Sequence, residues 1–263
     1  MTVHTVALDG IGSVDVTVTD RGEGRPVLLL HGGAGPPSVA AFASLLADRL
    51  HVHVYAPTHP GFGGTSRPDW LNSVPRLAAV YARLLAVLDL HDVVVVGNSI
   101  GGWIAAELAL ADRGRVGQLV LVDAGGIVVD GPPPVDIFAL SPEELSKLSF
   151  HNPAAFRIDP TKMSDQQRAG MAANRVALAV YGGRPSVGDP SLRSRLPKVE
   201  VPTLVLWGES DRVYPPDYGR AYAAAIPHAQ FQILPQAGHV PQMETPEALL
   251  TAIQKFVGTA AAP

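Results

Sequence analysis

The chain has 263 residues, of which 47% are hydrophobic and 17% are charged, and its formal net charge is −4. This composition indicates a compact globular protein of one domain, with or without an insertion, and argues against a disordered chain. Because acids and bases are mixed and no polybasic stripe or amphipathic segment is present, we expect neither nucleic acid nor a membrane as a partner.

The sequence contains no cysteine. Disulfides, thiolate nucleophiles and cysteine-built zinc sites are therefore excluded. No group of His, Asp and Glu has metal-ligand spacing, so we predict no metal and no cofactor. Residues 1–10 lack the basic and apolar regions of a secretory signal, and no apolar run approaches the ~20 residues of a membrane span. We expect a cytoplasmic protein, either a monomer or a homo-oligomer.

The predicted elements alternate along the chain. "VHTVAL" and "VDVTVTD", separated by "DGIG", predict an antiparallel hairpin. From Pro26 on, short apolar runs predict strands buried on both faces: "PVLLL", "HVHVYAP", "VVVVGN", "QLVLVDA", "TLVLWGE" and "AQFQILP". Helices are expected between them at 38–49, 75–90, 100–112, 216–226 and 245–257. This order predicts an α/β fold, with a mostly parallel sheet and helices on both faces.

Residues 130–199 break the alternation. They hold helical pieces around 141–149 and 164–181, no convincing strand, and too many large apolar side chains for a disordered linker. We predict a helical cap over 130–199, inserted between two strands and packed over the C-terminal edge of the sheet. Residues 1–129 and 200–263 then form the core.

The stretch "VVVVGNSIGGW", residues 93–103, places a serine where a buried strand turns sharply into a helix. Such a turn crowds its neighbours, and Gly97 and Gly101 supply the missing bulk. Ser99 is then exposed at the apex, in the G-x-S-x-G pattern of a nucleophile elbow. The alternative is that Ser99 is an ordinary helix N-cap.

A serine needs a base to remove its proton, and the base needs an acid to orient it. Downstream, "LVLWGESDRVYPP" places Asp211 in the loop after one strand, and "FQILPQAGHVPQMETPEAL" places His239 after the next. The carboxyl ends of parallel strands share one edge of a sheet. We therefore predict that Ser99, Asp211 and His239 form a catalytic triad.

Six motifs occur in the order typical of the α/β-hydrolase family: "LLLHGGAG", "PGFGGTS", "VGNSIGGW", "LVLVDAGG", "LWGESDRVYPP" and "AGHVPQMETPEAL". The chain resembles this family from about residue 3 to 257. The resemblance implies an eight-stranded sheet with the cap inserted after the sixth strand. It also implies an oxyanion hole made by the backbone N–H groups of Gly33 and Ile100, with His31 stabilising the loop behind it. Asp123 also follows a strand and is the rival to Asp211 for the acid.

A serine at the elbow favours an acyl-enzyme, and we predict hydrolysis of a carboxylic ester with a small to medium apolar acyl group, with water as the second reactant. "GNSIGG" and "WGESDRV" also resemble the meta-cleavage-product hydrolases, which cut a carbon–carbon bond in vinylogous 1,5-diketones, and Asn98 matches their elbow. Two features depart from that group. Val240 stands where a tryptophan commonly follows the histidine, and the arginine that binds the substrate carboxylate could be Arg175, Arg184 or neither.

Two other possibilities stay open. The chain could cleave lactones or amides or carry out perhydrolysis, or it could be a catalytically silent ligand receptor on the same fold. Specificity is expected in the cap and the adjoining loops. The candidate substrate contacts, each of which could equally be a packing residue, are Asn98, Trp103, Phe138, Tyr214 and Val240.

Overall fold

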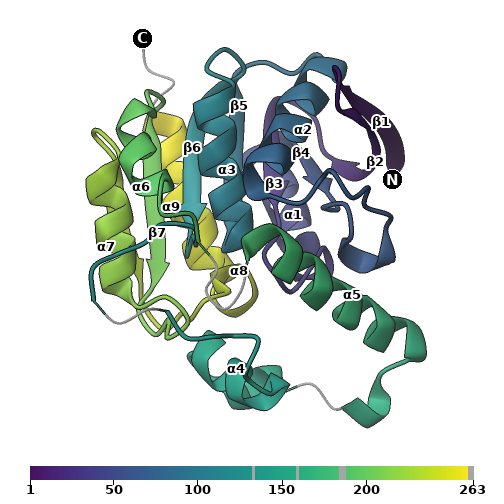
Figure 1. Cartoon of the computed structure of the whole chain (residues 1–263). Coiled ribbons are helices and arrows are strands. Elements are labelled where there is room, and N and C mark those ends of the chain that lie inside the picture. The colour runs from purple at the N-terminus through teal and green to yellow at the C-terminus, as the bar shows by residue number, and fades with distance from the viewer. Residues whose placement is uncertain (132–133, 158–159, 184–187, 260–263) are drawn as a thin grey trace.

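The computed structural model describes residues 1–131, 134–157, 160–183 and 188–259. Its centre is one eight-stranded sheet in the order β1-β2-β4-β3-β5-β6-β7-β8 (Figure 1). The hairpin of β1 (Thr2–Leu8) and β2 (Gly12–Arg21) is antiparallel, and β2 pairs antiparallel with β4. The other pairings are parallel, and they involve β3 (Arg25–Leu30), β4 (Val52–Pro57), β5 (Val93–Asn98), β6 (Val116–Val122), β7 (Thr203–Gly208) and β8 (Gln230–Leu234). The predicted α/β architecture is confirmed.

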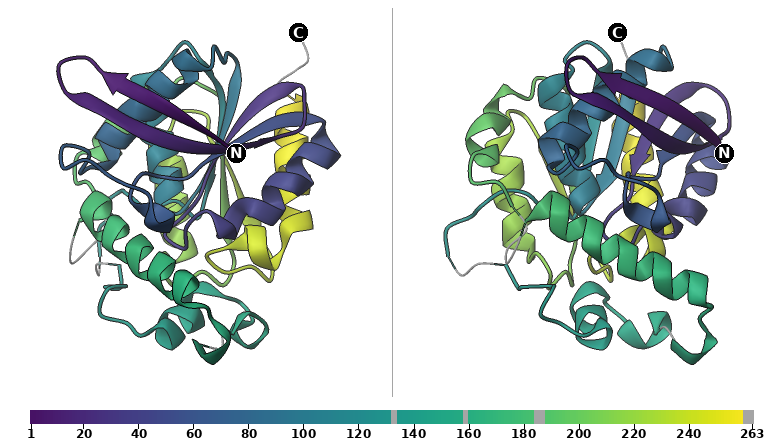
Figure 2. Two further views of the ribbon diagram at one scale, coloured as in Figure 1. Left: turned by 90° about the vertical axis from the view of Figure 1, so that its right-hand side faces the viewer. Right: turned by 45° about the vertical axis from the view of Figure 1, so that its right-hand side comes forward.

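The run of four valines in β5 is apolar because the strand is buried on both faces. Successive side chains of a strand point to opposite faces. Val93 and Val95 belong to the core under α2 (Val74–Val87) and α3 (Ile100–Ala111), whereas Val94 and Val96 belong to the core under α1 (Pro37–Leu50) and α9 (Pro246–Thr259). Figure 2 shows these helix pairs on opposite sides of the sheet.

The predicted core helices are observed within a few residues of the expected bounds. They are α1, α2, α3, α9 and α7 (Pro216–Ala225). Short helices occupy connections that the sequence pattern did not resolve, namely η1 (Phe62–Gly64), α6 (Leu192–Arg195), η4 (Leu196–Lys198) and α8 (Pro241–Glu244). None of the helices in the described ranges combines the length and apolarity that a membrane crossing needs.

The segment predicted as a cap contains α4 (Pro142–Ser149), η2 (Pro153–Phe156), η3 (Pro160–Lys162) and α5 (Asp165–Gly182). Both α helices begin with a capping box, Ser141 with Glu144 and Ser164 with Gln167, which satisfies their first free N–H groups. Over its described residues the segment has no strand, only an isolated bridge from Gly188 to Gly126. Figures 1 and 2 show α4 and α5 beyond one end of the sheet. The bounds 130–199 and a separate cap domain stay a prediction.

Candidate active site

Ser99 lies at the sharp turn between β5 and α3. Its backbone has φ 57° and ψ −119°, a conformation that L-residues rarely adopt and that stores strain. A Cβ at Gly97 would collide with the carbonyl of Gly101. A Cβ at Gly101 would collide with the carbonyl of Leu30. The two glycines therefore allow strand, helix and the loop after β3 to meet at the serine, whose side chain stays half-buried.

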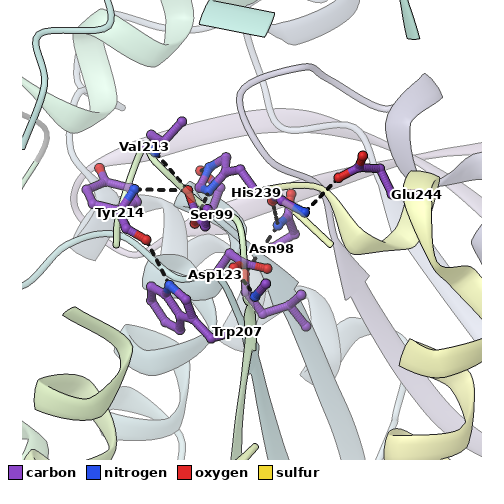
Figure 3. A network of polar contacts seen from close by, with 12 residues as sticks. Asn98, Ser99, Asp123, Trp207, Val213, Tyr214, His239 and Glu244 are labelled. Carbon is purple, nitrogen blue, oxygen red and sulfur yellow. Dashed lines mark hydrogen bonds and ion pairs between the residues drawn. The ribbon is translucent and has the colours of Figure 1, made fainter. Parts of the chain in front are cut away.

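The three predicted triad residues lie in hydrogen-bond contact (Figure 3). Nε2 of His239 is 2.9 Å from Oγ of Ser99, and its Nδ1 is 2.8 Å from Oδ2 of Asp211. Oδ1 of Asp211 accepts the N–H groups of Val213 at 2.8 Å and Tyr214 at 3.0 Å. Asp211 is therefore fixed by its own loop with one oxygen left for the imidazole, which is the arrangement that activates a serine.

Asn98 connects the elbow to the loop that carries His239. Its Nδ2 donates to the carbonyl oxygens of His239 at 2.9 Å and Val122 at 3.2 Å, and its Oδ1 accepts from Nε2 of Gln242 at 3.1 Å. The amide is buried and all these partners lie within the protein. These contacts position the backbone of His239, whereas the sequence analysis proposed Asn98 as a substrate contact.

Glu244 in α8 joins the same loop to the end of α4. Its carboxylate accepts N–H groups from Gly238 at 2.7 Å, His151 at 2.9 Å and Asn152 at 3.1 Å. The N–H of His239 donates in turn to the carbonyl of Ser149, the last residue of α4, at 2.7 Å. The predicted cap segment and the catalytic loop are thus fastened together. Glu244 lies five residues after His239, inside the motif "AGHVPQMETPEAL", but this motif gave no indication of its role.

The predicted oxyanion donors lie at the other side of Ser99. Ile100 is the first residue of α3, where backbone N–H groups have no acceptor within the helix. Gly33 follows β3, and a Cβ on Gly32 would lie 3.2 Å from Cβ of Ser99, so this loop packs directly against the elbow. Leu178 of α5 covers Gly33, where an added Cβ would lie 2.8 Å from its Cδ2. The loop that carries Gly33 and the first turn of α3 therefore meet at Ser99.

A neutral histidine pair supports the oxyanion loop. Nε2 of His31 accepts the N–H of His59 at 3.2 Å, so its Nδ1 carries the proton and donates to the carbonyl of Gly32 at 2.8 Å. That carbonyl shares a planar peptide with the N–H of Gly33, and fixing one fixes the direction of the other. Burial lowers the pKa of His31 to about 4.

His59 completes this pair. Its Nε2 is 2.9 Å from the carbonyl of His31, and its Nδ1 is 2.5 Å from the hydroxyl of Tyr81. Burial, followed by the nearby His31, lowers the pKa of His59 well below its usual value. Both rings are therefore neutral at pH 7 and locked in one tautomer. The sequence analysis assigned a role to His31 but missed His59 and Tyr81, for which only the "THPGFGG" motif was a signal.

α5 is fixed to the core above the oxyanion loop. The buried amide of Asn174 donates to the carbonyl of Ala34 at 3.0 Å and accepts the N–H of Gly63 at 2.7 Å. The hydroxyl of Tyr181 donates to the carbonyl of Pro60 at 2.9 Å. No local pattern predicted the Asn174 contacts, because they join residues more than 100 positions apart.

The remaining pocket candidates lie in different surroundings. Trp103 is 3% exposed and packs in the core beside Gly126, with Nε1 3.4 Å from Oε1 of Glu107. The ring of Tyr214 lies 5.7 Å from that of His239, and Val240 is buried directly after His239. Tyr214 and Val240 are therefore neighbours of His239, whereas Trp103 packs in the core.

Phe138 packs against Arg175 of α5. The guanidinium of Arg175 is 5.7 Å from the Phe138 ring and donates to its carbonyl at 2.5 Å. Both line an open groove of about 510 Å³, completed by Ala172, Val176, Ala179 and Val180. The other arginine considered for a substrate carboxylate, Arg184, lies outside the described residues.

Asp123 at the end of β6 brings a third ionisable group to the acid side. One oxygen each of Asp123 and Asp211 and one ring nitrogen of His239 lie within 4.8 Å of one another. Among the described residues this is the one group of three potential metal ligands, and two of its members are already committed to the hydrogen bond between them. The prediction of a metal-free site stays a prediction.

Known proteins resemble this chain over nearly its whole length. The model of the alpha/beta hydrolase family matches residues 27–252. A 2-hydroxy-6-oxononadienedioate/2-hydroxy-6-oxononatrienedioate hydrolase from Cupriavidus pinatubonensis is 30% identical, over 95% of this chain and 93% of the relative.

Two solved structures show the same fold. A meta-cleavage product hydrolase from Pseudomonas fluorescens has a TM-score of 0.77 at 22% identity, covering 98% of each chain. A thermophilic esterase from Thermogutta terrifontis has a TM-score of 0.70 at 25% identity, covering 100% of each chain. The protein is a hydrolase, and the chain belongs to the alpha/beta hydrolase family.

Proposed function

We propose that this hydrolase cleaves a carbon–carbon bond in a 2-hydroxy-6-oxo-dienoate, a vinylogous 1,5-diketone. The observation that carries the proposal is the relative named for this reaction, which is 30% identical along nearly the whole chain. The Gly-Asn-Ser elbow supports it. Ester hydrolysis, which the sequence analysis preferred, becomes the second candidate, because an elbow serine is common to both reactions and could not separate them.

In the proposed reaction Ser99 is the nucleophile. His239 receives its proton through Nε2, which is 2.9 Å from Oγ. Asp211 holds Nδ1 of the imidazole at 2.8 Å, so the proton of the neutral ring stays on that nitrogen and Nε2 is free to accept. The hydroxyl oxygen then bonds to the ketone carbon at position 6 of the substrate.

The N–H groups of Gly33 and Ile100 are the proposed donors to the oxyanion that forms on the ketone oxygen. Donors fixed before the reaction stabilise developing charge without reorganisation, and one such donor is worth roughly 10²–10³ in turnover. The His31 ring supports this role, since it holds the Gly32–Gly33 peptide in one orientation.

The distinctive step is the departure of a carbon. The reacting form is the keto tautomer, in which the proton of the 2-hydroxyl has moved to carbon 5, the double bond lies between carbons 3 and 4, and carbon 2 is a ketone. When the bond between carbons 5 and 6 then breaks, its electron pair moves to carbon 5 and is delocalised through this double bond onto the ketone oxygen at carbon 2. The protonated His239 returns its proton to this fragment, leaving an acyl group on Ser99. A water molecule, deprotonated by His239, then attacks the acyl carbon and releases a carboxylic acid and free Ser99.

The dienoate carboxylate needs a cationic partner. Arg175 reaches from α5 but donates to the carbonyls of Phe138 and Leu140. On substrate binding, Arg175 would give up its hydrogen bonds to these two carbonyls and pair with the substrate carboxylate instead. Alternatively, Arg184 would bind the carboxylate. The choice between the two stays open in the proposal.

Ester hydrolysis is the second candidate because it uses the same acyl-enzyme. The specific observation in its favour is the likeness to the thermophilic esterase, at 25% identity over each whole chain. An ester places its charge on a leaving oxygen, which needs no conjugated ketone to carry it. The two reactions therefore differ in the atom of the leaving group that carries the negative charge, an oxygen in the ester and a carbon conjugated to a ketone in the dienoate.

A two-substrate comparison tests the proposal. Purified protein and its Ser99→Ala variant are assayed with 2-hydroxy-6-oxononadienedioate, followed by loss of its visible absorbance, and with p-nitrophenyl esters of increasing chain length. We expect kcat/KM for the dienedioate to exceed that for every ester by at least about 10²-fold, and the variant to lose both activities. Faster turnover of the esters would replace the proposal by the second candidate.

A further inference from the structure

Asp123 has a side chain that the triad alone does not explain. It is 0% exposed, at the end of β6, with a positive φ of 47° that a non-glycine residue rarely adopts. Its Oδ1 accepts the N–H of Gly208 at the end of β7, at 2.8 Å. Its Oδ2 meets no donor among the described residues. A buried oxygen left in this way is costly unless it carries a proton and donates.

The groups that face Asp123 are mostly acids. Asp211 comes from the loop after β7 and Glu244 from α8, and a ring nitrogen of His239, from the loop after β8, lies within 4.8 Å. Burial, followed by the charge of Asp211, raises the pKa of Asp123 well above its usual value. Two buried carboxyl groups that share a site do not both ionise, because each charge opposes the other in a weakly polar interior.

The hydrogen bonds decide which of the two carries the charge. Asp211 accepts two backbone N–H groups on Oδ1 and the imidazole on Oδ2, so three donors stabilise its carboxylate. Asp123 accepts a single N–H. The negative charge therefore stays on Asp211, and the shared proton stays on Asp123.

We propose that Asp123 is a positioning residue that remains protonated and donates a hydrogen bond from Oδ2 to the carboxylate of Asp211. One carboxyl oxygen of Asp123 and one of Asp211 lie within 4.8 Å of each other. The bond holds Asp211 in line with Nδ1 of His239 and keeps one negative charge, not two, behind the imidazole. Asp123 follows β6 and accepts from the last residue of β7, and in the view of Figure 3 it lies between Ser99 and Trp207. The inference rests on the triad of the proposed function.

The test uses the rate at which a fluorophosphonate probe labels Ser99 between pH 5 and 10, because this needs no substrate. Asp123→Asn keeps an acceptor for Gly208 and places an N–H donor toward Asp211, as the protonated acid does. We expect its labelling rate to stay within about threefold of wild type and its pH midpoint within about 0.3 units. Asp123→Leu, which has no donor, should label roughly 10- to 100-fold more slowly, the loss of one hydrogen bond to a charged group.

Two further variants calibrate the measurement. Asp217→Asn changes an exposed aspartate of α7 in the same way and should leave rate and midpoint unchanged. Asp211→Asn removes the orienting acid and should lower the rate by about 10⁴-fold. Circular dichroism melts accompany every variant. If Asp123→Leu does not fold, the pH midpoint of Asp123→Asn still shows whether Asp123 is protonated or ionised.

Two results would overturn the inference. If Asp123 were ionised, removing its charge within 4.8 Å of the imidazole would move the labelling midpoint down by about two pH units in Asp123→Asn. If Asp123 were the orienting acid, Asp123→Asn would lose about 10⁴-fold and Asp211→Asn would not. A wild-type protein that the probe does not label would instead refute the proposed triad itself.

Discussion

The two buried polar clusters beside Ser99 differ in charge: one contains His31, His59 and Tyr81, and the other contains Asp211. On the oxyanion side, His31, His59 and Tyr81 are neutral, and each ring nitrogen of the histidines has one partner. On the acid side, Asp211 accepts from three donors, as the charged acid of the proposed triad requires. A group that only orients a peptide can be buried without charge, whereas a group that stabilises an imidazolium cannot.

The difference extends to the anchoring of the predicted cap. α5 is held over the oxyanion side by the neutral amide of Asn174. α4 is held over the acid side by the carboxylate of Glu244, which accepts N–H groups from both the catalytic loop and the segment after α4. Changes on the acid side should therefore have electrostatic consequences, and changes on the oxyanion side geometric ones.

The largest expected effect is the removal of the acid–base group. His239→Ala should lower kcat by 10⁴-fold or more, and Ser99→Ala by a similar factor, because neither residue acts without the other. The double variant should then be hardly slower than either single one. Steady-state kinetics on the three proteins measures this. Losses that multiply in the double variant would show that the two side chains, 2.9 Å apart, work independently.

The sequence predicted the triad because each member carries a local signature. Ser99 is in a glycine-flanked elbow, and Asp211 and His239 each follow an apolar run in the expected order. The core strands and helices were predictable for the same reason, since burial on one face leaves a period in the sequence and burial on both faces leaves a continuous apolar run. The contacts of Asn174, Glu244 and the second oxygen of Asp123 leave no such period.

The pocket candidates illustrate the limit. Trp103 follows the elbow by four residues, and proximity in sequence suggested a substrate contact, but on the helix it turns into the core beside Gly126. Asn98 precedes Ser99, and its amide donates to the backbone carbonyl of His239. A sequence places such side chains near the site but does not give the direction in which they point.

The next largest effect is expected from a variant that removes only the hydrogen bond orienting the loop of the predicted oxyanion donors. His31→Phe keeps a ring between His59 and Phe62, but removes the N–H that orients the Gly32 carbonyl. We expect kcat to fall by roughly 10²–10³ while KM changes little, since the lost interaction matters when charge develops.

His53→Phe is the matched control for this change. His53 lies on β4 and its side chain is 28% exposed. The control should keep wild-type kcat. Equal losses in the two variants, or a rise in KM without a fall in kcat, would contradict an orienting role for His31.

His31 should also make the free energy of unfolding depend on pH. Its folded pKa of about 4 lies below the ordinary 6.5, so below pH 6.5 the unfolded chain binds a proton that the folded chain does not. The free energy of unfolding should fall by about 3 kcal/mol from this group as the pH drops from 6.5 to 4. Asp123 works in the opposite direction, because its raised pKa costs stability as the pH rises.

Urea unfolding at several pH values separates these contributions. The difference in unfolding free energy between wild type and His31→Phe should shrink steadily from pH 7 to pH 4. The lowered pKa of His59 also reduces the unfolding free energy as the pH falls. Because His59 is present in both proteins, its contribution cancels to first order in the difference. A difference that does not depend on pH would mean that His31 has the same pKa in the folded and the unfolded chain, which would contradict its neutral role.

The smallest effect tests the anchor on the acid side. Glu244→Gln keeps the shape of the side chain but leaves a single acceptor oxygen for the N–H groups of Gly238, His151 and Asn152. Charge-assisted hydrogen bonds are about twice as strong as neutral ones, and we expect a loss of about 1–2 kcal/mol in unfolding free energy. Because Gly238 precedes His239, kcat should fall by about 10-fold as well.

Glu247→Gln supplies the comparison within the same part of the chain. Glu247 pairs with Arg49 at 3.6 Å and its side chain is 65% exposed, so its loss should change stability by less than about 0.5 kcal/mol and leave kcat unchanged. The decisive quantity is the ratio of the two effects on kcat. If Glu244 only stabilises the end of α4, its variant will melt earlier but turn over at the wild-type rate below its melting temperature. A parallel loss of rate at 10 °C, where both proteins are fully folded, ties the anchor to the position of His239.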